Sequence, residues 1–179
     1  TGFKGTWLGY WLTTMGAKVH GYSLAPVTDP SMFELLQLDQ LLVHRIGDIR
    51  DPSSLSRALA ECDPEVVLHL AAQPIVSEGY AAPVETFDTN IMGVVHLLEA
   101  CRRLEKPVPV LIVSSDKCYL NNGTGRAFEI DDPLGGYDPY SASKAGTEIV
   151  TASYRASFFG KPGAPRIASA RAGNVVGGG

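Results

Sequence analysis

The chain has 179 residues, of which 45% are hydrophobic and 19% are charged, and its formal net charge is -4 at pH 7. This composition is typical of one compact globular domain and excludes a disordered or fibrous chain. The 15 Lys and Arg residues are scattered along the sequence, so they predict neither a nucleic-acid interface nor a membrane surface. No apolar run reaches the roughly 20 residues that a membrane span needs. We therefore expect a cytoplasmic protein with a small-molecule partner.

Strand-like and helix-like segments alternate along the chain. The strand-like segments are residues 17–24, 41–49, 64–72, 108–115 and 166–172. The central ones are apolar on both faces, which is typical of parallel strands covered by helices on both sides. Helical patterns are found at residues 6–15, 53–62, 84–105 and 138–159, and a loop over the strand ends is expected at 121–138. This order predicts an α/β fold with a doubly wound parallel sheet.

The segment "TGFKG" at the start of the chain has the spacing of a phosphate-binding turn. Gly2 and Gly5 would be the last two glycines of a G-x-x-G-x-x-G turn, in which the backbone approaches a pyrophosphate closely. The following helix N-terminus offers free N–H groups to the negative charge. Gly2, Phe3, Lys4 and Gly5 are therefore candidate cofactor-binding residues. Two glycines three residues apart also occur by chance, but their position before a βαβ run favours the cofactor.

The ends of the predicted strands supply further candidate cofactor contacts. Asp48 could accept a hydrogen bond from an adenine amino group, and Ile49 could cover the adenine ring. Ser23 lies near the end of the segment 17–24 and is a further candidate cofactor-binding residue. The next predicted strand ends in a segment with small side chains, which would let a cofactor lie against the backbone. The candidate residues of this segment are Leu70, Ala71, Ala72 and Gln73. Strand-end packing would explain each motif alone, whereas their combination favours a cofactor.

Tyr140 and Lys144 are four residues apart, so they share one face of the predicted helix. An ammonium near a phenol favours the phenolate, which can then act as a base. Ser115 ends the strand 108–115 and could hydrogen-bond to the same hydroxyl. Asp116 and Lys117 then place an acid and an amine at the mouth of the sheet. The alternatives are a chance Tyr–Lys pair on a surface helix and an ordinary charged turn.

The cysteines and histidines predict no further site. Cys62, Cys101 and Cys118 lie far apart and match neither a disulfide framework nor a CxxC metal site, so free thiols are expected. The histidines are too far apart in the sequence for the spacing of metal ligands. They are His20, His44, His69 and His96.

The segments "TGFKG", "HLAAQ", "SS", "YSASK" and "RAGNVVGGG" together resemble the nucleotide-sugar branch of the extended short-chain dehydrogenase/reductase family, over essentially the whole chain. The resemblance implies a Rossmann domain that binds NAD, with Ser115, Tyr140 and Lys144 as the oxidation triad. "SSDKCY" is most similar to the branch that acts on CDP-sugars, which implies a nucleotide-sugar substrate, CDP-glucose. In that branch Asp116 would protonate a departing hydroxyl, and Lys117 would take the proton of carbon 5.

The resemblance also predicts the organisation of the protein. Residues 1–179 would form one dinucleotide-binding Rossmann domain that is truncated at both ends, without the C-terminal part that binds the sugar nucleotide, and they would be inactive alone. A homodimer through the helices 84–105 and 138–159 is expected. The choice of NAD over NADP is implied by the family alone, because Ser23 provides no carboxylate to repel the 2'-phosphate of NADP. The alternative functions are a 4-epimerase of the same family and a non-catalytic dinucleotide sensor.

Overall fold

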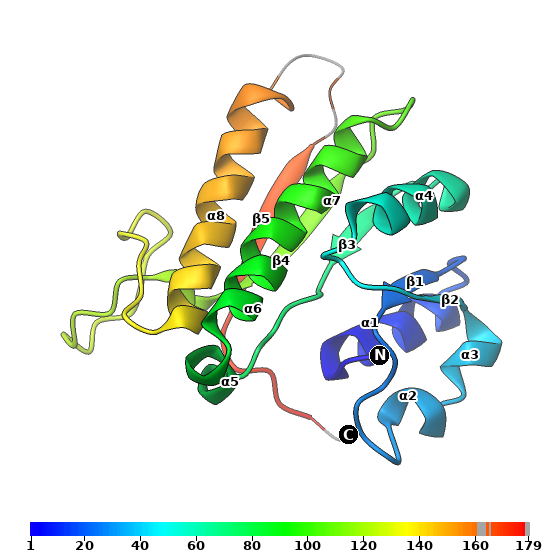
Figure 1. The fold of residues 1–179 in the computed structure, drawn as a ribbon, viewed down its shortest axis with the longest axis horizontal. Coiled ribbons are helices and arrows are strands. Elements are labelled where there is room, and N and C mark those ends of the chain that lie inside the picture. The colour runs from blue at the N-terminus through cyan, green and yellow to red at the C-terminus, as the bar shows by residue number, and fades with distance from the viewer. Residues whose placement is uncertain (161–163, 165, 178–179) are drawn as a thin grey trace.

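Parallel strands and helices alternate along the chain in a computed structural model that describes residues 1–160, 164 and 166–177 (Figure 1). The strands are β1 (His20–Ser23), β2 (Val43–Ile46), β3 (Val67–His69), β4 (Val110–Ser115) and β5 (Ile167–Ala172). Each of the predicted strand segments contains one of these strands. The predicted α/β fold is therefore confirmed.

The predicted helices are present, and shorter ones join them. The longer helices are α1 (Phe3–Thr14), α4 (Pro52–Cys62), α7 (Gly93–Arg102) and α8 (Pro139–Ser157). The shorter helices are α2 (Met32–Leu35), α3 (Leu38–Leu41), α5 (Val76–Ala81) and α6 (Pro83–Phe87). The side chain of Asp138 caps α8 and that of Asp51 caps α4, and a proline occupies the first position of each helix. Helices α2, α3 and α5 were not predicted, because helices of 4 to 6 residues show too little periodicity in the sequence.

Several predicted helix and strand boundaries are wrong. Helix α1 begins at Phe3 rather than at residue 6, because Gly2 is its N-cap. The predicted helix 84–105 is divided, since the π-helical segment η1 (Asp88–Met92) separates α6 from α7, which ends at Arg102. Leu41, expected in a strand, closes α3 instead. The π-helical turn widens the helix at Asn90, whose side chain forms hydrogen bonds with Gln73 and Ser143.

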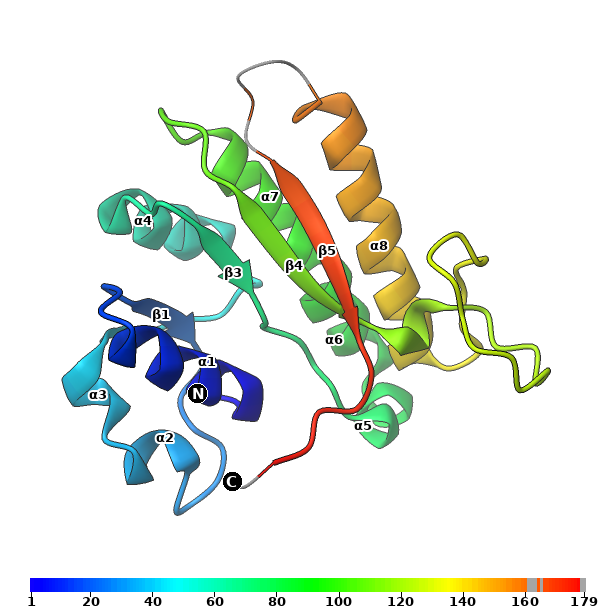
Figure 2. The ribbon, with the colours of Figure 1, turned by 180° about the vertical axis from the view of Figure 1, so that it is seen from behind.

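All strand pairs are parallel, and hydrogen bonds divide the described strands into two sheets. β1 pairs with β2, while β3, β4 and β5 form the second sheet in that order. Figure 1 shows α7 and α8 in front of β4 and β5, and the reverse view in Figure 2 shows α1 in front of β1. Helices thus lie on both sides of the strand layer, as the doubly wound prediction requires.

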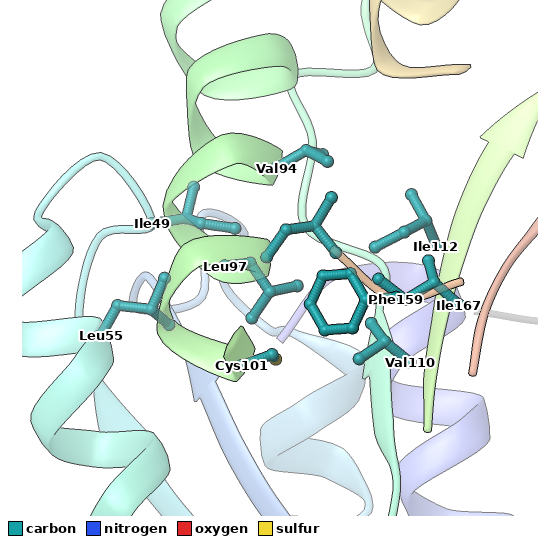
Figure 3. Close-up of a cluster of buried hydrophobic side chains, with 10 residues drawn as sticks. Ile49, Leu55, Val94, Leu97, Cys101, Val110, Ile112, Phe159 and Ile167 are labelled. Carbon is teal, nitrogen blue, oxygen red and sulfur yellow. The ribbon is translucent and has the colours of Figure 1, made fainter. Parts of the chain in front are cut away.

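The core lies between α7 and the strands β3 to β5. Val94 and Leu97 of α7 point toward Val110 and Ile112 of β4 (Figure 3). Burying such side chains contributes roughly 1.5–3 kcal/mol each. This packing fixes β4, and the end of β4 carries the residues of the candidate site. In the described parts of the chain, no helix is both long and apolar enough to cross a bilayer.

Candidate active site

The end of β4 carries three linked polar side chains. After Ser115 the chain enters the short 3-10 helix η2 (Asp116–Cys118). The Ser115 hydroxyl donates to Asp116 Oδ1 at 3.1 Å and accepts from the Lys117 backbone N–H at 3.2 Å. Lys117 Nζ lies 3.1 Å from Asp116 Oδ2, and both side chains are partly exposed. Ser115 thus orients the turn that carries the acid and the amine.

Helix α8 brings the Tyr140–Lys144 pair to the same place. Lys144 Nζ lies 6.0 Å from the centre of the Tyr140 ring, as the spacing of four residues predicts. The Lys144 side chain is buried, whereas Tyr140 is partly exposed in the first turn of the helix. Helix α8 packs directly against η2. The elements that carry the Tyr–Lys pair and the Asp–Lys pair therefore pack against each other, although more than twenty residues separate the two pairs in sequence.

The electrostatic environment of Lys144 differs from that of a surface lysine. Burial, and to a smaller extent the positive charge of Lys4, lower the pKa of the Lys144 ammonium to about 8. The negative charge of Glu148 opposes these effects. The Lys144 amine is thus still mainly charged at neutral pH. The influence of Lys4 also shows that the "TGFKG" turn lies within electrostatic range of the Tyr–Lys pair.

This environment predicts a direct titration result. NMR titration of the Lys144 side chain should give a pKa of about 8, below the ordinary value of 10.5. The unfolded chain binds more protons between these two values, so this group makes the free energy of unfolding rise with pH across that window. Lys4→Met should raise the pKa of Lys144, while the control Lys18→Met should leave it unchanged. A Lys144 pKa near 10.5 would contradict the burial.

The start of α1 fits the phosphate groups of a dinucleotide. Gly2 is the N-cap, and its carbonyl accepts from the Thr6 N–H at 2.9 Å. A Cβ built on Gly2 or Gly5 would have no heavy atom within 4 Å, so the space beside both glycines is open to a ligand. Phe3 and Lys4 form the first helical positions next to this space. A pyrophosphate could therefore approach the backbone and the free N–H groups of the first turn.

Ser23 lies beside this turn at the end of β1. Its Oγ lies 3.2 Å from Thr1 Oγ1 and 2.9 Å from His44 Nε2. The structure thus brings Ser23 and Gly2 into one neighbourhood, as a cofactor that spans both would require.

Asp48 and Ile49 have protein partners of their own. Arg50 Nη2 donates to Asp48 Oδ2 at 2.6 Å, and hydrogen bonds from Arg50 lower the pKa of the Asp48 carboxyl. The side chain of Ile49 is buried in the core (Figure 3). Contact of this pair with an adenine ring remains a prediction, and it would require Asp48 to share its carboxylate with Arg50.

The segment after β3 is held by a residue that the sequence analysis missed. Leu70, Ala72 and Gln73 are partly buried and Ala71 is exposed. Asn90 is 1% exposed, and its side chain accepts from the Gln73 N–H at 2.8 Å and donates to the Gln73 carbonyl at 3.0 Å.

Asn90 also connects this segment to α8. Its Nδ2 donates to Ser143 Oγ at 2.8 Å, and Ser143 Oγ donates to the Tyr140 carbonyl at 2.7 Å. Asn90 therefore fixes the end of β3 relative to the first turn of α8. A polar residue inside the apolar pattern of the predicted helix 84–105 was the available sequence signal.

The cysteines are free thiols, as predicted. Burial raises the pKa of Cys118 to about 11 and that of Cys101 to about 12, so neither thiol is activated as a nucleophile. Among the described residues, no three His, Cys, Asp or Glu side chains come together in a way that could hold a metal ion.

Comparison with known proteins identifies the family. The GDP-mannose 4,6 dehydratase family matches residues 1–161. The chain belongs to this family. The resemblance to the nucleotide-sugar branch of the short-chain dehydrogenases/reductases is therefore confirmed, and so is the Rossmann fold that it implies.

Individual members of the GDP-mannose 4,6 dehydratase family and solved structures agree with this assignment. The chain is 48% identical over 183 aligned positions to the CDP-glucose 4,6-dehydratase of Salmonella typhimurium strain LT2, covering 100% of this chain and 51% of that protein. The UDP-glucose 4-epimerase of Thermus thermophilus in complex with NAD superposes with a TM-score of 0.77 at 28% identity, over 95% of this chain and 51% of that one. The UDP-glucose 4-epimerase of Stenotrophomonas maltophila with bound NAD gives a TM-score of 0.79 at 26% identity, over 95% and 49%. The chain thus spans about half the length of these proteins.

Proposed function

We propose that the intact protein is an NAD-dependent sugar-nucleotide 4,6-dehydratase that converts CDP-glucose into CDP-4-keto-6-deoxyglucose and water. The observation that carries the proposal is the packing of η2, which carries Asp116 and Lys117, against α8, which carries Tyr140 and Lys144. One pair suits oxidation, and the other suits elimination of water. The 48% identity to a CDP-glucose 4,6-dehydratase supports this substrate, and the NAD bound in the similar epimerase structures supports the cofactor.

The first pair would act at carbon 4 of the sugar. Tyr140 as a phenolate accepts the proton of the 4-hydroxyl and becomes a neutral phenol, and the nearby Lys144 ammonium stabilises the phenolate before this transfer. Bound NAD supplies a hydride acceptor for carbon 4 and a hydride donor for carbon 6. Gly2 and Gly5 leave space for its pyrophosphate.

The second pair would eliminate water across carbons 5 and 6. A ketone at carbon 4 makes the proton of carbon 5 acidic. Lys117 takes this proton as an amine, while Asp116 as a carboxylic acid protonates the 6-hydroxyl, which leaves as water. Transfer of one proton from Lys117 to Asp116, whose side chains are 3.1 Å apart, produces both required forms at once. A substrate that covers this partly exposed pair would favour the neutral forms by removing water.

Two other functions fit the fold less well. A 4-epimerase shares the Tyr140–Lys144 chemistry, and the similar solved structures include epimerases. An epimerase eliminates no water, so Asp116 and Lys117 would have no role in it. A non-catalytic dinucleotide sensor would need neither pair, because the turn at Gly2 and the strand ends suffice for binding.

An isotope experiment separates these possibilities. With CDP-glucose deuterated at carbon 4, the product should carry the deuterium at carbon 6, with no net formation of reduced cofactor. In deuterated water the product should gain label at carbon 5, because that proton leaves and another returns. An epimerase would return the label to carbon 4, and a sensor would give no product. Either result would contradict the proposed reaction.

We also propose a homodimer through the helical face of residues 84–105 and 138–159. Val84, Met92 and Ile149 are exposed apolar side chains on this face, which a second copy could cover. Analytical ultracentrifugation of the intact protein at micromolar concentration should give the mass of a dimer. Ile149→Asp should shift it toward a monomer, whereas Ile130→Asp in the exposed loop should not. A monomeric parent protein would contradict the proposal.

A further inference from the structure

A buried ion pair lies one helical turn beyond Lys144. Glu148 follows Lys144 by four residues on α8, so both side chains share one face. Arg171 of β5 donates from Nη2 to Glu148 Oε2 at 3.0 Å, and the Ser169 hydroxyl donates to the same oxygen at 2.9 Å. Only 4% of the Glu148 side chain and 19% of the Arg171 side chain are exposed. The pair therefore fixes α8 relative to β5.

The same arginine also holds the chain that follows η2. Arg171 Nη1 donates to the Tyr119 hydroxyl at 2.8 Å and to the Ile130 carbonyl at 2.8 Å. Its guanidinium lies 4.8 Å from the centre of the Tyr119 ring, which stacks on Phe128. Burial opposes the charge of Arg171, but hydrogen bonds to Tyr119 and Glu148 raise the pKa of the guanidinium above its ordinary value.

Tyr119 is the residue directly after η2, so its position determines where η2 ends. The Tyr119 N–H donates to the Asp116 carbonyl at 3.3 Å, and the Gly135 N–H donates to the Cys118 carbonyl at 2.9 Å. Arg171 thus contacts α8 through Glu148 and the Asp116–Lys117 turn through Tyr119.

We propose that Glu148 and Arg171 are positioning residues that hold the Asp116–Lys117 turn in register with Tyr140 and Lys144. This inference rests on the proposed function, in which the two pairs act in succession on one sugar. Oxidation needs only the Tyr140 pair, whereas elimination needs Asp116 and Lys117 at the correct distance from carbons 5 and 6. Loss of the positioning pair should therefore slow elimination more than oxidation.

The experiment compares four variants of the intact protein with a matched control. Arg171→Met and Glu148→Gln remove one charge each, and Arg171→Lys keeps the charge but loses the planar fork that reaches Tyr119. Tyr119→Phe removes only the hydroxyl that accepts from Arg171. Arg103→Met is the control, since it breaks an exposed ion pair with Glu99 on α7. Thermal unfolding identifies any variant that fails to fold.

Two readouts follow, and the first does not depend on activity. Hydrogen exchange of the amides of Tyr119, Leu120 and Gly135 should become faster in the four variants, while amides of β4 stay protected. The second is the ratio of elimination to oxidation in single-turnover assays, which should fall by up to roughly 100-fold, because small misplacements of reacting groups cost this much. The KM for CDP-glucose should change little.

The outcomes distinguish the inference from the proposed function. If the parent protein does not dehydrate CDP-glucose, the proposed function fails, and the amide exchange still tests whether the pair positions the turn. If local exchange and the elimination-to-oxidation ratio match the parent in Tyr119→Phe and Arg171→Lys, the positioning role is wrong. Faster hydrogen exchange throughout the protein, together with an equal loss of the oxidation and elimination rates, would show a general stabilising role. This result would overturn the inference as well. Arg103→Met should resemble the parent in every readout.

Discussion

Tyr140→Phe is expected to lower turnover of CDP-glucose by roughly 100-fold to 10,000-fold, the usual effect of losing a general base. Phenylalanine keeps the ring that packs in the first turn of α8 but has no hydroxyl to accept the proton of the 4-hydroxyl. The Lys144 ammonium remains in place, 6.0 Å from the ring centre, so binding of NAD should change little.

Steady-state kinetics and NAD binding by calorimetry test this prediction together. Tyr137→Phe is the matched control, since Tyr137 is 87% exposed and lies just before the same helix. It should retain the rate of the parent protein. A Tyr140→Phe protein with a tenth of the parent activity would place the base on another residue.

Asp116→Asn should block elimination while leaving oxidation intact. Asparagine has nearly the same shape as the protonated acid, but its amide cannot give a proton to the departing 6-hydroxyl. The loss expected for a general acid is again roughly 100-fold to 10,000-fold. Because oxidation at carbon 4 depends on Tyr140 and Lys144, it should still proceed to the 4-keto sugar.

The predicted signal is accumulation of enzyme-bound reduced nicotinamide, measured by its absorbance after rapid mixing with CDP-glucose. The 4-keto-glucose nucleotide should accumulate in parallel, as detected by mass spectrometry after rapid quenching. Asp131→Asn provides a control in the exposed loop and should show no accumulation. Elimination at the parent rate in Asp116→Asn would exclude Asp116 as the acid.

Much of the fold could be predicted because its signals are local. Apolar runs of a few residues predicted the strands, and the helical pattern at residues 138–159 predicted α8. The spacing of Tyr140 and Lys144 predicted their shared face, because the geometry of a helix turn is the same in every protein. Those features depend on neighbours within about one helical turn or one strand.

The break in the predicted helix 84–105 could not be predicted in the same way. The π-helical turn at η1 coincides with Asn90, whose side chain bonds to Gln73 and Ser143, 17 and 53 residues away in sequence. The composition of the segment favours a continuous helix. The hydrogen bonds to these distant partners explain why the buried Asn90 amide lies at the π-helical turn.

By itself, the sequence determined the α/β order, the glycine-containing turn before α1 and the types of side chain in the candidate site. The tertiary structure decided that Asp116 and Lys117 lie beside α8, that Lys144 is buried with a lowered pKa, and that Arg171 connects Glu148 to Tyr119. The physical reason is the distance along the sequence between the groups that interact. Secondary structure follows from nearby residues, whereas burial, electrostatic shifts and buried ion pairs depend on groups that only the folded chain brings together.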